Sequence, residues 1–112
     1  MKRALTLRTR AAGALLTLAL LGSAAVAEAP PDAARVLIKD FMFVPMQLTA
    51  RVGTSVTWVN QDDEPHTVLS EGLFRSGALD SGEEFTFRFD KPGTYRVFCS
   101  IHPQMKATII VQ

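Results

Sequence analysis

The feature that most restricts the fold of this 112-residue chain is an alternation of apolar and polar residues in short runs. The run from Glu84 to Phe89 is the clearest case, because its three phenylalanines all fall on one face of an extended strand. Similar or β-branched runs, bounded by turn residues, occupy 35–39, 47–52, 55–60, 66–69, 94–99 and 106–111. The pattern predicts an all-β fold: an antiparallel or mixed two-sheet β-sandwich of about seven strands.

Residues 1–27 have the layout of a secretory signal peptide. Basic residues at Lys2, Arg3, Arg8 and Arg10 precede an apolar run over 11–21, and 25–27 reads Ala-Val-Ala, a cleavage site. We therefore exclude 1–27 from the fold and expect export to the periplasm, with no membrane attachment after cleavage. The alternative is an uncleaved N-terminal anchor, although the run is short for a span of about 20 residues.

The rest of the chain predicts a flexible lead-in at 28–34, which contains a Pro-Pro pair, and one domain at 35–112. Without residues 1–27, 8 Lys and Arg face 11 Asp and Glu, a formal charge of about −3. A mildly acidic domain without a basic run is a poor nucleic-acid binder. It suits a partner with a basic or mixed docking surface.

Cys99 is the only cysteine, so an exported form has no internal disulfide. A free thiol in an oxidising compartment is either buried or held by a metal. His102 and Met105 follow Cys99 at steps of three residues. That spacing, in a loop between two predicted strands, favours the metal.

His66 completes a set of two imidazoles, one thiolate and one thioether, which is the ligand set of a blue copper site. Zinc accepts cysteine and histidine but rarely methionine. We expect His66, Cys99 and His102 to form a trigonal plane around one copper ion, with Met105 as a weak axial ligand. Taken singly, His66 could be a turn histidine and Met105 core filler. Together they predict one-electron transfer between Cu(II) and Cu(I).

Several motifs resemble those of the cupredoxins, small blue copper proteins, and the short Cys-x-x-His-x-x-Met loop is similar to that of the amicyanin-like subgroup. The motifs that carry this resemblance are Phe43-x-Pro45, Gly53-x-x-Val56-x-Trp58-x-Asn60, Pro65-His66, Gly93-x-Tyr95 and Cys99-x-x-His102-Pro103-x-Met105. The resemblance implies a Greek-key sandwich, with residues 35–112 as its copper-binding domain. It further implies a soluble periplasmic electron carrier, expected to be monomeric. Redox partners would dock transiently around His102, Pro103 and Gln104.

Two positions depart from the amicyanin-like pattern. Thr67 stands where that subgroup has Asn, and its hydroxyl can pair with Ser100. Ile101 stands where it has Pro, so a backbone N–H is available to the Cys99 sulfur. Such a donor withdraws charge from the thiolate, and we expect it to raise the reduction potential.

Two other functions remain open on the sequence. A copper delivery or storage module would favour clustered, exposed methionine and histidine, and an immunoglobulin-like structural domain would bind no copper. An enzyme is not expected, because protein donors fill every coordination position.

We expect Met42 and Met46 to pack inside the sandwich. The acidic run at 62–64 is expected to be a solvated loop, with a docking role as the alternative.

Overall fold

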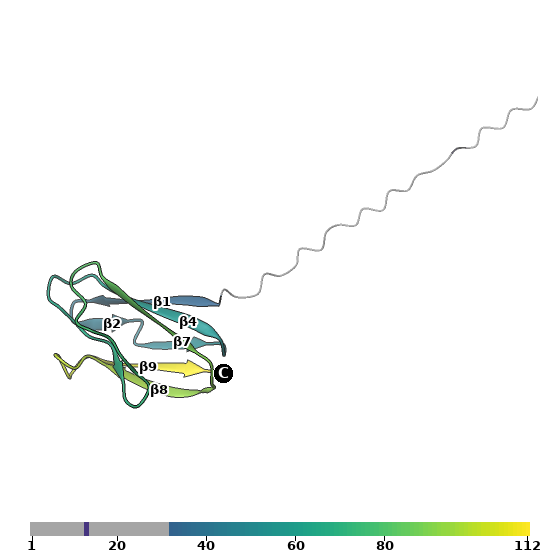
Figure 1. The fold of residues 1–112 in the computed structure, drawn as a ribbon. Coiled ribbons are helices and arrows are strands. Elements are labelled where there is room, and N and C mark those ends of the chain that lie inside the picture. The colour runs from purple at the N-terminus through teal and green to yellow at the C-terminus, as the bar shows by residue number, and fades with distance from the viewer. Residues whose placement is uncertain (1–12, 14–31) are drawn as a thin grey trace, which may run out of the picture.

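The structure is a computed structural model that describes Gly13 and residues 32–112. Apart from Gly13, the predicted signal peptide lies outside the described residues, as do residues 28–31 of the predicted lead-in. Nine strands in this part of the chain form two mixed sheets packed face to face (Figure 1). The all-β sandwich is thereby confirmed. In the same part of the chain, no helix is long and apolar enough to cross a membrane.

The first sheet has four strands, in the order β2 (Met42–Val44), β1 (Ala33–Lys39), β4 (Thr54–Asn60) and β7 (Glu84–Phe89). The second has five, in the order β3 (Gln47–Ala50), β9 (Lys106–Val111), β8 (Gly93–Phe98), β5 (Leu69–Ser70) and β6 (Phe74–Arg75). The β1–β4 and β3–β9 pairs are parallel and the other pairs are antiparallel.

The strand count of about seven was too low, because β2 and β6, which were not predicted, are only three and two residues long. Such short strands show too few alternating positions to be recognised in a sequence. The first strand also begins at Ala33, two residues before its predicted start, because β4 extends far enough to pair with Ala33 and Ala34.

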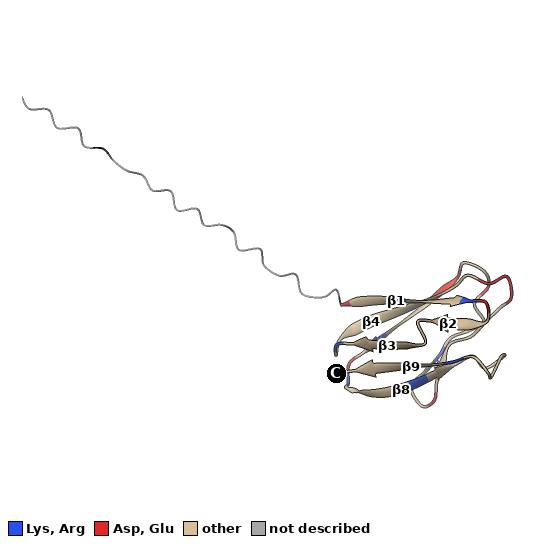
Figure 2. Ribbon diagram, turned by 180° about the vertical axis from the view of Figure 1, so that it is seen from behind, with Lys and Arg blue, Asp and Glu red and all other residues tan. Residues whose placement is uncertain are grey.

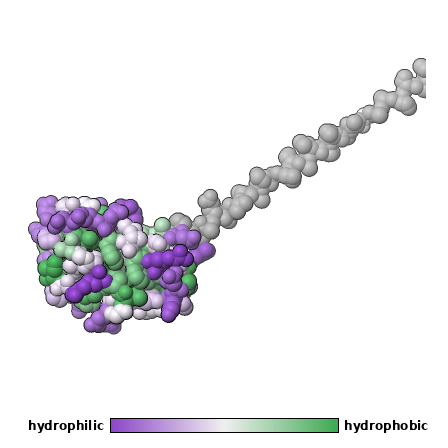
Figure 3. Space-filling model, viewed as in Figure 1, coloured by the Kyte–Doolittle hydropathy of each residue, from purple (hydrophilic) through white to green (hydrophobic). Residues whose placement is uncertain are grey.

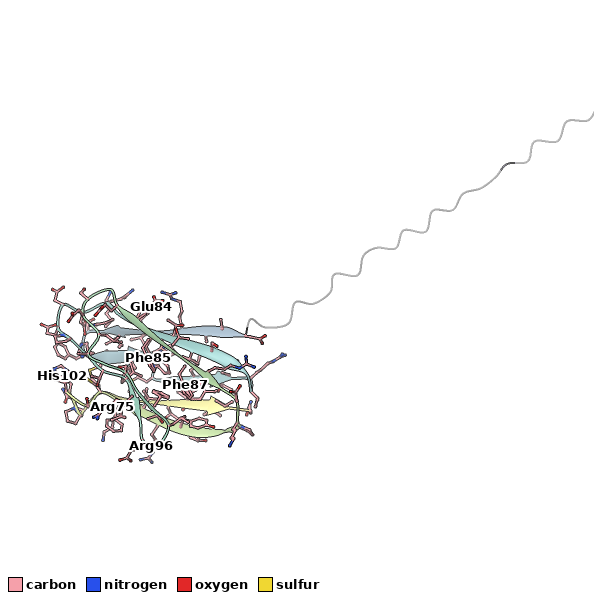
Figure 4. The ribbon with its side chains drawn as sticks, viewed as in Figure 1. Arg75, Glu84, Phe85, Phe87, Arg96 and His102 are labelled. Atoms are coloured by element: carbon pink, nitrogen blue, oxygen red, sulfur yellow. The ribbon has the colours of Figure 1, made fainter. Side chains whose placement is uncertain are left out.

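The core lies between the two sheets. Its largest fully buried aromatic side chains are Trp58, Phe43 and Phe89, from three strands of the first sheet. Phe85 and Phe87 are half-buried, because β7 is an edge strand whose inward face is only partly covered. They lie over the middle of the face seen in Figure 4, where the surface is apolar between polar margins (Figure 3).

The prediction that Met42 and Met46 pack in the sandwich is wrong. Their exposed fractions are 48% and 60%. Met42 lies on β2, an edge strand that turns Phe43 inward, so its own side chain points outward. Met46 lies in the bend between β2 and β3. Val52, expected to continue the alternation of the 47–52 run, is also exposed, since β3 ends at Ala50.

One end of the sandwich, which we call the site end, carries the loops that bring the predicted ligands together. These loops are 40–41, 61–68, 79–83 and 99–105. The site end lies opposite the C-terminus (Figure 1), and His102 lies there (Figure 4). Because β1, β4 and β8 all end here, their rigid backbones fix the starting point of each loop.

Candidate metal centre

Three of the four predicted ligands meet at the site end. One donor atom each from His66, Cys99 and His102 lies within 4.8 Å of the other two. The Nδ1 atoms of the two histidines are 3.1 Å apart, and Cys99 Sγ is 4.0 Å from the first and 3.7 Å from the second. The two histidine rings therefore present the same nitrogen to a shared point beside the sulfur.

This spacing fits a trigonal metal site. For bonds of about 2.0 Å to nitrogen and 2.3 Å to sulfur, three donors in a plane lie about 3.5–3.8 Å from one another. The separations found here bracket that range. The donors thus need only small shifts to bind one ion, and a thiolate with two imidazoles selects a soft or borderline transition metal.

Cys99 and Met105 are the first and last residues of a tight loop that follows β8. The N–H of Cys99 donates to the carbonyl of Met105 at 3.2 Å, and the N–H of Met105 donates to the carbonyl of His102 at 2.9 Å. Both side chains are buried, with 0% of Cys99 and 2% of Met105 exposed. The loop thus holds a thiolate, an imidazole and a thioether within seven residues.

His66 reaches the site from a different part of the chain. It forms an isolated two-way bridge with Leu79: its N–H donates to the Leu79 carbonyl at 3.1 Å, and its own carbonyl accepts from Leu79 at 2.7 Å. Its side chain is fully buried. This bridge fixes the backbone of His66, so a turn histidine exposed to solvent is excluded.

Asp62 is a site residue that the sequence reasoning missed, because the acidic run was interpreted as a solvated loop. Its side chain is 9% exposed, whereas Asp63 and Glu64 are exposed as expected. Oδ2 lies 2.8 Å from His66 Nε2, on the side of the ring away from the metal-facing nitrogen. The four-residue spacing from Asp62 to His66 was the available signal, since ligand histidines commonly pair with a carboxylate.

The surroundings of Asp62 keep its carboxylate ionised. Burial by itself raises the pKa of Asp62, but hydrogen bonds from the N–H groups of Phe41 and Asp40 and from His66 outweigh burial and lower it. Its own N–H donates to Asn60 Oδ1 at 2.9 Å, which fixes the start of the loop. An ionised carboxylate accepts from Nε2–H, and this leaves the Nδ1 lone pair of His66 facing the cluster.

Hydrogen bonds also favour the form of the Cys99 sulfur that can bind a metal. Burial raises the pKa of the Cys99 thiol, but the N–H of Thr67 at 3.3 Å, the Thr67 hydroxyl at 3.7 Å and the N–H groups of His102 and Ile101 lower it overall. The Ile101 N–H, expected to act on this sulfur, makes the smallest of these contributions to the lowered pKa, and Thr67 makes the largest. A lowered pKa favours the thiolate that a metal binds.

Thr67 joins the two chain segments that carry the ligands. Its hydroxyl oxygen lies 2.8 Å from Ser100 Oγ and accepts from the Ser100 N–H at 2.8 Å. The pairing expected between Thr67 and Ser100 is thereby confirmed. A single hydroxyl thus ties the segment after His66 to the loop after Cys99.

Comparisons with known proteins agree with this site. The cupredoxin-like domain family matches residues 11–111. The chain is 33% identical to amicyanin-alpha of Methylorubrum extorquens, with 98% of this chain and 99% of that protein covered. It is 31% identical to the amicyanin of Paracoccus versutus, with coverages of 79% and 71%. A solved purple cupredoxin from Nitrosopumilus maritimus has a TM-score of 0.67 at 31% identity, with coverages of 70% and 99%. The chain therefore belongs to the cupredoxin-like domain family, and its cofactor is copper.

Proposed function

We propose that this protein is a type 1 (blue) copper protein that carries single electrons between periplasmic redox partners. In this proposal His66, Cys99 and His102 hold the ion in a plane and Met105 is its weak axial ligand. The observation that carries it is the convergence of two Nδ1 atoms and one sulfur at a single point. Bound copper supplies the Cu(II)/Cu(I) couple.

The protein's own contribution is a site that changes little when the charge of the ion changes. Asp62 holds His66 through its distal nitrogen, and Thr67 holds Ser100 and the sulfur. Because these contacts are made by the folded chain itself, the donors need little rearrangement during electron transfer. Four protein donors also leave no open coordination position for a substrate, which supports a carrier over an enzyme.

The surface around His102 supports transient docking of redox partners. His102 is half-buried at the site end, and its neighbour Ile101 and nearby Phe41 are exposed apolar side chains. Acidic residues cluster on other loops of the same end (Figure 2). An apolar centre beside acidic loops suits a small interface with a partner that carries basic residues.

Export to the periplasm is supported by the leader-like sequence of residues 1–27. It is also supported by the near full-length similarity to amicyanin-alpha, which includes this segment. In the proposed role the mature protein acts as a soluble monomer, since a shuttle must leave one partner before it meets the next.

The first test is to add one equivalent of Cu(II) to the mature domain and to record visible absorption and EPR spectra. An intense thiolate-to-copper band with narrow copper hyperfine splitting is expected. The matched control is Cys99→Ser, which keeps the size of the side chain and removes the thiolate, and it should lose the band. A pale spectrum for the unmodified protein would rule out the proposed site.

The carrier role is tested separately by the electron self-exchange rate of the copper-loaded protein, measured by NMR line broadening in mixtures of the two redox forms. Fast exchange is expected. Slow exchange would instead favour copper delivery, a function for which the exposure of Met42 and Met46 is the one supporting observation. In that case Met42→Leu and Met46→Leu should slow copper transfer to a chelator.

A further inference from the structure

The turn between β1 and β2 has an unusual backbone. Asp40 and Phe41 both have positive φ angles, 54° and 59°. Two consecutive residues in this region form the kind of tight hairpin turn that favours Asn-Gly or Gly-Gly. A bulky residue such as phenylalanine rarely adopts this conformation, and such outliers persist only where the surrounding structure holds them.

Asp62 is the group that holds this turn. Its Oδ1 accepts from the Asp40 N–H at 2.7 Å, and its Oδ2 accepts from the Phe41 N–H at 2.9 Å. The same carboxylate contacts His66 Nε2. The strained turn is therefore anchored to the metal centre as well as to the hairpin that it closes.

The result of this conformation is the position of the Phe41 ring. Its centroid lies 5.0 Å from that of His66 and 4.9 Å from that of His102, with interplanar angles of 88° and 90°. Both are edge-to-face contacts of the favourable kind. Phe41 is 37% exposed, so its ring contacts both imidazoles and is also partly open to solvent.

The two histidines differ in how far the orientation of their rings depends on the contact with Phe41. His66 is fully buried, and Asp62 fixes its ring through the nitrogen that does not face the cluster. His102 is half-buried, and within residues 32–112 the hydrogen-bonding contacts of its ring run only through Nδ1. Its ring orientation therefore depends on packing.

We propose that Phe41 is a positioning residue that locks the His102 ring in its ligand orientation, and that the left-handed turn exists to place it there. This inference rests on the proposed assignment of His102 as a ligand. The lock acts before metal binding, because every contact that builds it is made by protein atoms. It accounts for a costly phenylalanine at a position where glycine would fit without strain.

The test uses Phe41→Gly, which removes the ring and also relieves the backbone strain, so that the turn should form readily. Asp40→Gly is the matched control. It relieves backbone strain at the adjacent residue and retains the residue-40 N–H that donates a hydrogen bond to Asp62. It also keeps the Phe41 ring. Phe41→Tyr restores a ring and should behave as the unmodified protein. Should Phe41→Gly fail to fold, Phe41→Asn replaces it, since asparagine tolerates positive φ.

The first measurement is NMR of the imidazole ring signals in the metal-free protein at fixed pH. In Phe41→Gly we expect exchange broadening or averaging of the His102 signals, with those of His66 unchanged, and no change in Asp40→Gly. The second is the self-exchange rate after copper loading, which should fall severalfold in Phe41→Gly alone. Sharp His102 signals and an unchanged rate in Phe41→Gly would overturn the inference. The metal-free NMR result stands whether or not the native protein proves to be an electron carrier.

Discussion

The carboxylate of Asp62 lies 2.8 Å from the distal ring nitrogen of His66, and both groups are almost fully buried. This contact fixes which His66 nitrogen carries the proton, and so which one can bind the metal. The same carboxylate accepts from two backbone N–H groups of the β1–β2 turn. One side chain therefore connects the buried histidine, the strained turn and the Phe41 ring.

Replacing Asp62 by asparagine should raise the reduction potential. The change removes a negative charge next to His66, which disfavours Cu(II) relative to Cu(I), by on the order of 50 mV. Spectroelectrochemical titration measures the shift. The control is Asp63→Asn, which makes the same charge change at an exposed neighbour and should shift the potential far less. Equal shifts in both variants would mean that the reduction potential responds only to net charge and not to the contact of Asp62 with His66.

Asp62 should also stabilise the metal-free fold in a pH-dependent way. Its pKa is lowered in the folded state, so its contribution is fully present above the ordinary value of 3.8 and is lost as pH falls through the lower folded value. Urea unfolding of the wild type and Asp62→Asn, near neutral pH and in acid, tests this. The stability gap between them should narrow in acid. A gap that stays constant or widens would contradict the direction of the shift.

Ile101→Pro should lower the reduction potential. Proline has no N–H, so the sulfur of Cys99 loses one of the donors that withdraw charge from it. Ile101→Ala is the control, because it also removes the apolar side chain but keeps the N–H, and its potential should stay near that of the wild type. A reduction potential that rises or does not change in Ile101→Pro would contradict this role of the Ile101 N–H.

Thr67→Val should loosen the link between the two ligand segments. It keeps the side-chain shape but removes the hydroxyl that bonds Ser100 and approaches the sulfur. We expect a loss of about 1–2 kcal/mol in the free energy of unfolding, because the part-buried Ser100 N–H is left unpaired. Thermal and urea unfolding give this value. Thr67→Ser retains the hydroxyl and should recover most of the lost free energy of unfolding. A Thr67→Val variant as stable as Thr67→Ser would show that the hydroxyl contact with Ser100 does not stabilise the fold.

Trp58→Phe should cost little stability. Trp58 is fully buried, and within the described residues its indole Nε1–H has no hydrogen-bond partner. Removing an unpaired buried donor offsets part of the cavity that the smaller ring leaves, so we expect a cost below about 1.5 kcal/mol. Phe43→Leu is the comparison, since it shrinks another fully buried aromatic side chain without removing a polar atom. If Trp58→Phe is clearly the more damaging change in urea unfolding, the donor is satisfied in solution.

Chemical identity and spacing made most of the site predictable. Cys99, His102 and Met105 lie on one short loop, so their proximity follows from the chain itself. Met42 was misplaced because an apolar side chain does not indicate whether its strand lies at a sheet edge, and Met46 because it lies in the bend between β2 and β3 rather than in a strand. Asp62 was missed for the opposite reason: an acidic residue between two other polar residues looks solvated unless its buried partners are known.

The sequence alone determined the β-sandwich and the metal-binding chemistry. Alternation requires each strand to bury one face, and a thiolate, two imidazoles and a thioether allow few ions other than copper. Only the tertiary structure decided how the site is supported. The contacts of Asp62 with Phe41 and of Thr67 with Ser100 join residues 21 and 33 positions apart. Such contacts depend on which loops the two sheets bring to the same end, and local sequence patterns carry no information about that.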